Sequence, residues 1–159
     1  MKYNPEWLHQ TDSRLPRKFQ RFGCFVRAIV QGAEDYFGEA LSVSAMNRLI
    51  DRAKTEKAIN AKMFLQNADS HVHLLNIAID ELGYWKQGYR GLYFGRKDGD
   101  YVLDEEDVSF KFYVDEYDVT NAAQHFVRAD EDGTIIWNPM PDLKLGARKS
   151  RRAFAIRRS

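Results

Sequence analysis

The chain has 159 residues, of which 44% are hydrophobic and 30% are charged, and its formal net charge is +1. This composition is typical of one compact domain, and it excludes collagen-like, low-complexity and largely disordered chains. No apolar run approaches the roughly 20 residues of a membrane helix, and the N-terminal segment has no apolar signal core. We therefore expect a cytoplasmic protein with a single domain over 1–159, including a polar lead-in segment at 1–19.

Three helices are expected in the first half of the chain. Apolar residues recur at three- and four-residue steps over 24–37, and Gly38 ends this helix. Ser42 or Ser44 caps a second helix, with an apolar face of its own. A third helix covers about 70–82, where the same periodicity returns.

Strands are expected after the helices. The stretch 84–100 is rich in glycine and tyrosine and predicts loops with a short strand, whose tyrosines either line a substrate groove or pack in the core. Asp130-Glu-Asp-Gly133 predicts a hairpin turn with a positive φ at the glycine. Helices followed by strands indicate the α+β class with an antiparallel sheet. Short β-branched or aromatic runs predict its strands at 108–114, 125–129, 134–137 and 152–156.

The small net charge conceals two oppositely charged segments. Nine acids lie between Asp98 and Asp118, whereas the last twelve residues carry six basic side chains and no acid. A basic end can bind nucleic acid or a membrane surface. The alternation around Phe154 and Ile156 instead predicts a strand that lies near the acidic segment or in solvent. We expect neither a nucleic-acid nor a membrane partner; the acidic segment either selects a basic peptide or forms a solvated face.

The single cysteine excludes an intramolecular disulfide and a thiolate-rich zinc site. Cys24 lies at the start of the first predicted helix, where free N–H groups and the helix dipole lower a thiol pKa and can face an oxyanion. Gln20 either completes that oxyanion hole with its amide or is a solvated loop residue. The alternative for Cys24 itself is a small buried hydrophobe. Neither a metal nor an organic cofactor is implied.

A base for this thiol is expected on the predicted hairpin. His125 begins one strand, and Asn138 stands on the return strand before Pro139. The register places the two β-carbons roughly 5–8 Å apart. An Asn138 carbonyl that accepts the imidazole N–H leaves the other ring nitrogen for the thiol. Taken singly, His125 is an ordinary strand-end histidine and Asn138-Pro139 an ordinary turn; jointly they favour a Cys-His-Asn triad.

This order of residues resembles the papain-like cysteine peptidase superfamily, most closely the small bacterial branch with the bacteriocin-leader peptidases and their phage relatives. The matching stretches are 20–25 and 125–139. The resemblance implies N-terminal helices packed on a C-terminal antiparallel sheet. It also implies roles for four residues: nucleophile for Cys24, general base for His125, orienting residue for Asn138 and oxyanion donor for Gln20.

The expected function is therefore a thiol hydrolase, a cysteine peptidase or amidase, acting on a peptide or amide substrate. One alternative is a catalytically inactive papain-like protein that binds a peptide or cell-wall fragment. The other is a charged interaction module in which Cys24 is merely buried. Fast alkylation of Cys24 at pH 6–7 is expected for the hydrolase and slow alkylation for the interaction module.

Overall fold

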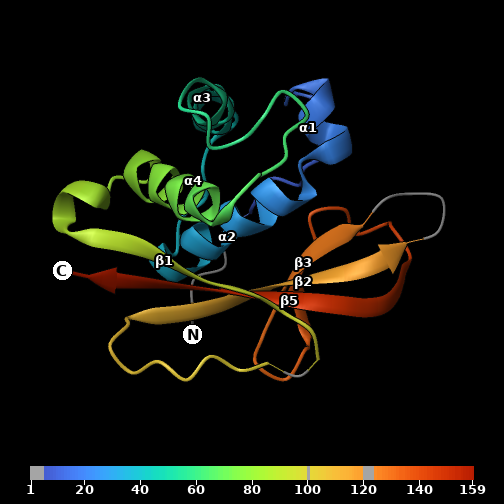
Figure 1. The fold of residues 1–159 in the computed structure, drawn as a ribbon. Helices are drawn as coiled ribbons and strands as arrows, with labels where there is room; N and C mark the ends of the chain where they lie inside the picture. Colours follow the sequence, from blue (N-terminus) through green and yellow to red (C-terminus); the bar gives the residue numbers. More distant parts are fainter. Residues whose placement is uncertain (1–5, 100, 120–123) are drawn as a thin grey trace.

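The computed structural model describes residues 6–99, 101–119 and 124–159 and has two layers (Figure 1). The helices lie on one face of a five-stranded sheet in which neighbouring strands are antiparallel. The predicted α+β class and antiparallel sheet are thereby confirmed. The start of the predicted lead-in, 1–5, and Asp100 of the acidic segment lie outside the described residues.

Two of the three predicted helices begin at the residues that the sequence indicates. The helix at 24–37 has the predicted bounds, and Ser42 caps the next one by accepting a hydrogen bond from the Ala45 N–H at 3.1 Å. The third starts earlier than predicted because Asn67, which accepts from the Ser70 N–H at 2.9 Å, caps it. The helices are α1 (Arg17–Phe22), α2 (Cys24–Phe37), α3 (Val43–Thr55) and α4 (Ala68–Glu81).

Helix α1 was not predicted, and the lead-in expected over 1–19 ends within it. Six residues are too few to show a helical period, but Pro16 precedes the first turn and suits a helix start. The buried Phe19 holds α1 against the other helices. Its last residue, Phe22, is separated from α2 by Gly23 alone.

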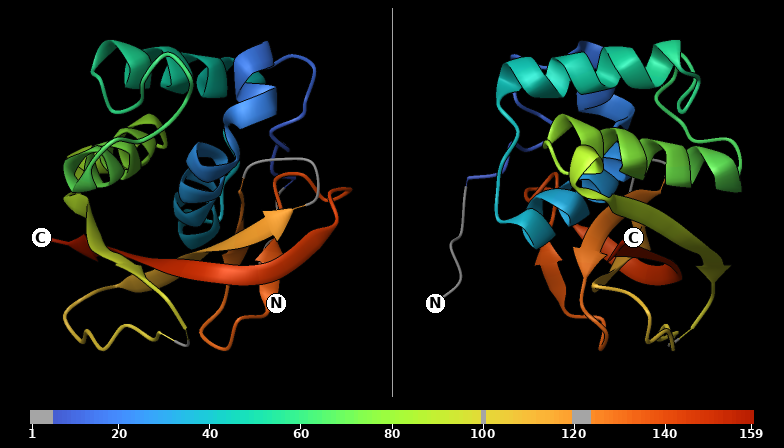
Figure 2. Two further views of the ribbon diagram at one scale, coloured as in Figure 1. Left: turned by 45° about the vertical axis from the view of Figure 1, so that its right-hand side comes forward. Right: turned by 90° about the vertical axis from the view of Figure 1, so that its left-hand side faces the viewer.

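The sheet has the strand order β1-β5-β2-β3-β4, so the strand that is latest in the sequence lies between β1 and β2 (Figure 2). The prediction of a mere short strand in 84–100 is wrong, because β1 has nine residues and follows the short 3₁₀ helix η1 (Trp85–Gln87). Gly91 weakens the strand signal, yet it is needed there: a β-carbon would lie 2.7 Å from the Leu75 side chain of α4. The strands are β1 (Tyr89–Lys97), β2 (Phe110–Val119), β3 (His125–Ala129), β4 (Ile135–Trp137) and β5 (Leu145–Arg158).

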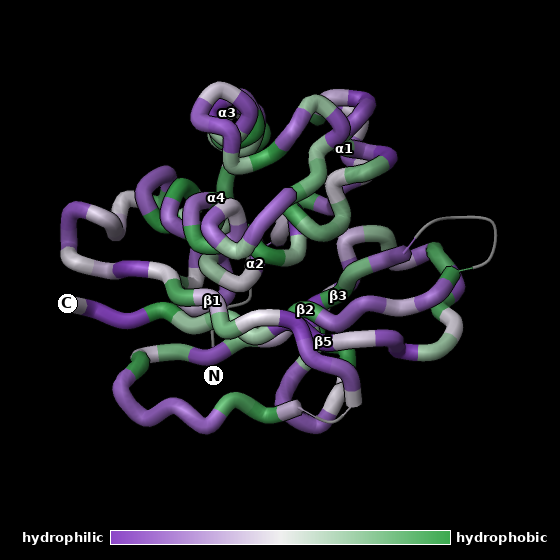
Figure 3. Tube along the Cα trace, in the orientation of Figure 1, coloured by the Kyte–Doolittle hydropathy of each residue, from purple (hydrophilic) through white to green (hydrophobic). Residues whose placement is uncertain are grey.

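The main core lies between the helices and the sheet. Figure 3 shows that α3 is hydrophilic on its outer side and hydrophobic toward the other helices. Phe112 of β2 and Phe154 of β5 stack at 5.0 Å between ring centroids. Gly32 lets α2 approach them, because a β-carbon there would lie 2.3 Å from the Phe112 ring. The tyrosine-rich stretch also serves packing, since Tyr84 stacks on Phe37 at 3.9 Å.

The basic end of the chain meets part of the acidic segment within the sheet, which is one of the two placements that the sequence leaves open. Arg151 Nε lies 2.7 Å from Asp115 Oδ1, and both side chains are fully buried. Arg152 Nη1 lies 3.1 Å from Glu116 Oε1. These arginines of β5 therefore join adjacent strands. Within the described part of the chain, no helix has both the length and the apolarity required to cross a membrane.

Candidate active site

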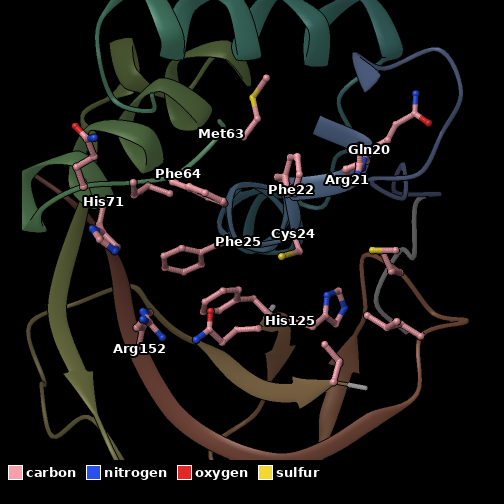
Figure 4. Close-up of a pocket in the computed structure, with 17 residues that line it drawn as sticks. Gln20, Arg21, Phe22, Cys24, Phe25, Met63, Phe64, His71, His125 and Arg152 are labelled. Carbon is pink, nitrogen blue, oxygen red and sulfur yellow. The ribbon is translucent and has the colours of Figure 1, made fainter. Parts of the chain in front are cut away.

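A pocket of about 770 Å³ opens where α2 and β3 begin (Figure 4). Its walls come from the α1–α2 junction, the loop before α4, the start of β3, the loop after β4, and one residue each of α4, β2 and β5. Three of the predicted site residues, Gln20, Cys24 and His125, are among those that line it. The fourth, Asn138, is hydrogen-bonded to His125. The fold thus brings together residues that are more than a hundred positions apart.

Cys24 is the first residue of α2, and Figure 4 shows its side chain directed into the pocket. Gly23 makes this possible. A β-carbon at residue 23 would lie 2.5 Å from the Phe19 ring and 2.6 Å from the Phe19 carbonyl oxygen, so only glycine fits between α1 and α2. The free N–H groups of the first helical turn therefore stand next to the thiol.

The imidazole of His125 is fixed by Asn138. The ring Nε2 lies 2.7 Å from the Asn138 amide oxygen, and that oxygen also accepts from the Met140 N–H at 2.9 Å. Because an amide oxygen can only accept, Nε2 carries the proton and Nδ1 is the basic nitrogen of the neutral ring. The strand pairing explains the contact. Arg128 of β3 pairs with Trp137 of β4, and the two strands are antiparallel, so Asn138 lies toward the start of β3, where His125 stands. Gly133 has the predicted positive φ, 90°, in the turn of this hairpin.

The thiol and the imidazole are both held in their neutral forms. Burial raises the pKa of Cys24 to about 11, although the backbone N–H groups of Phe126, Phe25 and Cys24 itself favour the thiolate. Burial also lowers the pKa of His125, against the opposing effect of its hydrogen bond to Asn138. The expected lowering of the thiol pKa by the helix start is therefore wrong. Apolar surroundings destabilise the thiolate more than these N–H groups stabilise it.

The backbone N–H of Phe126 acts on the thiolate although Phe126 belongs to β3 and Cys24 to α2. Phe126 directly follows His125, so the sulfur lies against the very part of β3 that carries the imidazole. With Nε2 bonded to Asn138, Nδ1 is the ring nitrogen that has a free lone pair on this side of β3.

Gln20 does not have the predicted place in the site. Its amide Nε2 donates to the Leu15 carbonyl at 2.7 Å, and Figure 4 shows the side chain directed away from Cys24. The amide serves to hold α1 against the lead-in. The donors at the thiol are instead the backbone N–H groups at the start of α2, those of Cys24 and Phe25.

The lead-in segment contributes to the site in a way that the sequence does not indicate. The Gln10 N–H donates to the Pro139 carbonyl at 3.1 Å, and its side chain donates to the Gln20 carbonyl at 3.1 Å. The His9 ring stacks on Trp137 at 5.7 Å, with the two planes 1° apart. Residues 9 and 10 thus connect the turn that carries Asn138 to the helix that precedes Cys24. No periodicity or motif marks such contacts between distant loops.

The site therefore contains a thiol, an imidazole oriented by an amide, and backbone N–H donors at a helix start. Groups of these types can act as nucleophile, general base and oxyanion donors. Comparison of the protein with protein-family models, curated proteins and solved structures finds no match.

Proposed function

We propose that the protein is a papain-like thiol hydrolase that cleaves a peptide or amide bond. The observation that carries this proposal is the 2.7 Å hydrogen bond from His125 Nε2 to Asn138, which leaves Nδ1 as the basic nitrogen beside the pocket that Cys24 enters. The order of the elements supports it, since the cysteine begins α2, the histidine begins β3 and the asparagine follows β4.

Acylation starts from a neutral thiol and a neutral imidazole. His125 Nδ1 takes the thiol proton while the sulfur forms a bond to the substrate carbonyl carbon, and the carbonyl oxygen becomes an oxyanion. The N–H groups of Cys24 and Phe25 donate to this oxyanion. The imidazolium then gives its proton to the amide nitrogen, the C–N bond breaks and the amine leaves. The acyl group remains on Cys24 as a thioester.

Deacylation uses the same base. His125 Nδ1 takes a proton from water while the water oxygen attacks the thioester carbonyl. The C–S bond breaks, the thiolate recovers a proton from the imidazolium, and a carboxylic acid is released. Asn138 accepts from Nε2–H throughout and so keeps Nδ1 directed at the reacting atoms.

The raised pKa of Cys24 favours one alternative, a pocket that binds a ligand without cleaving it. A neutral thiol in the free protein is compatible with catalysis only when His125 removes the proton during the attack. A charged interaction module is less well supported, because Arg151 and Arg152 of the basic end already pair with Asp115 and Glu116.

A panel of peptide vinyl sulfones tests the proposal, because they form a covalent adduct with a thiol that a base assists. We expect an adduct on Cys24, detected by intact mass, and a rate that His125→Ala lowers by about 100-fold or more. His73→Ala is the matched control, since His73 is half-exposed on α4 and bonded to Glu56 at 2.8 Å. An equal rate in His125→Ala and the unchanged protein would overturn the proposal.

A further inference from the structure

The residues that follow Cys24 and His125 form a second feature of the pocket. Phe25 and Phe126 stack with ring centroids 4.4 Å apart and planes 22° apart. The guanidinium carbon of Arg152 lies 5.1 Å from the Phe25 centroid and 4.9 Å from the Phe126 centroid. Figure 4 shows Cys24 and His125 at one side of the pocket and Arg152 at the other, with Phe25 between them. The pocket thus has a reactive end and a cationic end.

At the cationic end, Arg152 lines the pocket, whereas its carboxylate partner Glu116 does not. Arg152 Nη1 donates to Glu116 at 3.1 Å and to the Ser150 hydroxyl at 3.0 Å. Glu116 also meets Arg96 at 3.8 Å, and Arg96 in turn lies 3.9 Å from Asp98. The bonds of Arg152 to Glu116 and Ser150 both use one terminal nitrogen, and Arg152 also bonds to the Tyr93 side chain, whereas a guanidinium has five N–H donors on three nitrogens. Its side chain is 15% exposed and lines the pocket.

The remaining wall suits an uncharged, apolar body. Among the described residues that line the pocket, Arg21 and Arg152 are charged at neutral pH, and none is Asp or Glu. Phe22 and Phe64, 40% and 46% exposed, meet edge to face at 6.1 Å. A cation in this pocket would lose water and find no carboxylate on the wall, whereas an anion would find a guanidinium.

Building on the proposed function, we propose that the substrate is a peptide or acyl amide with an apolar body and a carboxylate, bound with the carboxylate at Arg152 and the scissile carbonyl at Cys24. The apolar body lies against Phe25 and Phe126, which separate the two ends. The acidic segment gives no reason to expect a basic peptide here, because Asp115 and Glu116 are paired with arginines of β5.

Three iodoacetanilides test this substrate class because they differ only in the para group: carboxylate, carboxamide or trimethylammonium. Each alkylates Cys24, and each rate constant at pH 8 and low salt is divided by that for free cysteine. We expect the carboxylate to react about tenfold faster than the carboxamide, because it gains a charge-assisted hydrogen bond, and the trimethylammonium to react most slowly.

Variants assign the preference to Arg152. Arg152→Gln should make the carboxylate and carboxamide rates equal, and Arg152→Lys should keep a reduced preference. Glu116→Gln removes the charge of the buried carboxylate that pairs with Arg152, so it should enlarge the preference for the carboxylate reagent. This variant tests the role of Arg152 while keeping Arg152 in place. The matched control is Arg90→Gln on β1, whose guanidinium lies 3.4 Å over the Trp85 ring and outside the pocket. It should leave all three rates unchanged.

Equal rates for the carboxylate and carboxamide in the unchanged protein, or an unaltered preference in Arg152→Gln, would overturn this inference. The proposed function is read separately, from His125→Ala, which should lower all three rates by the same factor. A charge preference that survives while His125→Ala has no effect on rate would reject the hydrolase and leave an anion-binding pocket. A His125 effect without a charge preference would reject only the substrate class.

Discussion

Two buried imidazoles line the same pocket, and the proposed function assigns a catalytic role to only one of them. His125 and His71 both have a pKa lowered chiefly by burial, and each has one ring nitrogen bonded to an asparagine oxygen. His125 uses Nε2 and a side-chain oxygen, at 2.7 Å; His71 uses Nδ1 and the Asn67 backbone oxygen, at 2.6 Å. The difference lies in the neighbours.

His71 is enclosed by rings, whereas His125 lies beside the thiol. The His71 ring stacks on Tyr93 at 4.2 Å and meets Phe25 edge to face at 5.3 Å. His125 instead lines the pocket together with Cys24, and the N–H of the next residue, Phe126, works against the rise in the Cys24 pKa. In the proposed function, therefore, the nearby thiol, and not burial or a fixed tautomer, distinguishes His125 from His71.

The largest expected effect separates the two histidines. His125→Ala should lower the rate of vinyl sulfone addition by about 100-fold or more, whereas His71→Ala should change it by less than about threefold. The second variant should instead unfold at a lower temperature, because it removes a ring from a packed cluster. Equal losses of rate in both variants would show that the pocket's shape, rather than a base at His125, controls Cys24. Intact-mass kinetics and thermal unfolding provide the two measurements.

The pH dependence of alkylation sharpens the assignment. In His125→Ala the rate with iodoacetamide should rise about tenfold per pH unit from pH 7 to 10, since only the thiolate reacts and the pKa of Cys24 is about 11. The unchanged protein should react faster at pH 7 and have a flatter profile, because His125 accepts the thiol proton. Superimposable profiles would contradict a role for His125 as base. Any fast alkylation at pH 6–7 would therefore come from proton removal by His125, and not from a lowered pKa of the thiol as the sequence suggested.

The two asparagines should separate in the same way. Asn138→Ala removes the oxygen that orients His125 and should lower the rate of vinyl sulfone addition by about tenfold. Asn67→Ala keeps the backbone oxygen that holds His71 but removes the cap of α4, and should cost about 1 kcal/mol of folding free energy without changing the rate. Urea unfolding and adduct kinetics on both variants test this; a rate loss in Asn67→Ala would count against the distinction.

The smallest expected effect is shared by the two histidines. In the folded protein the pKa of each lies below its ordinary value of about 6.5, so the unfolded chain takes up protons first as the pH falls. Stability should therefore be at its full value above pH 6.5 and decrease below it. His71→Gln and His125→Gln should each reduce this loss between pH 7 and 5, measured by urea midpoints. An unchanged slope in both variants would contradict burial in the neutral form.

The contact between His125 and Asn138 could be predicted from the sequence because both residues belong to one hairpin. The spacing from His125 to Asn138 and the turn at Gly133 fix which residues face each other. The position of Cys24 at a helix start could be predicted because Gly23 precedes it and apolar residues recur at helical spacing after it. Strand β1 was underestimated because Gly91 weakens the pattern, and only the approach of Leu75 explains that glycine.

The features that the sequence did not indicate depend on contacts between distant elements. The place of Gln20 depends on Leu15 and Gln10, which the lead-in brings to it. The raised pKa of Cys24 depends on how α2 packs on β3, and the cluster of Phe25, Phe126 and Arg152 depends on α2, β3 and β5 together. A period or motif describes neighbours within one element and carries no such information.

The central position of β5 has a consequence for synthesis of the protein. This strand pairs with β1 on one side and β2 on the other, yet it follows both in the sequence. A nascent chain that has not yet released residues 145–158 from the ribosome has two open strand edges and lacks Arg152. Such edges are prone to pair with other chains. Slow translation or arrest just before this segment should therefore lead to aggregation, and a chain truncated before β5 should need a chaperone to stay in solution.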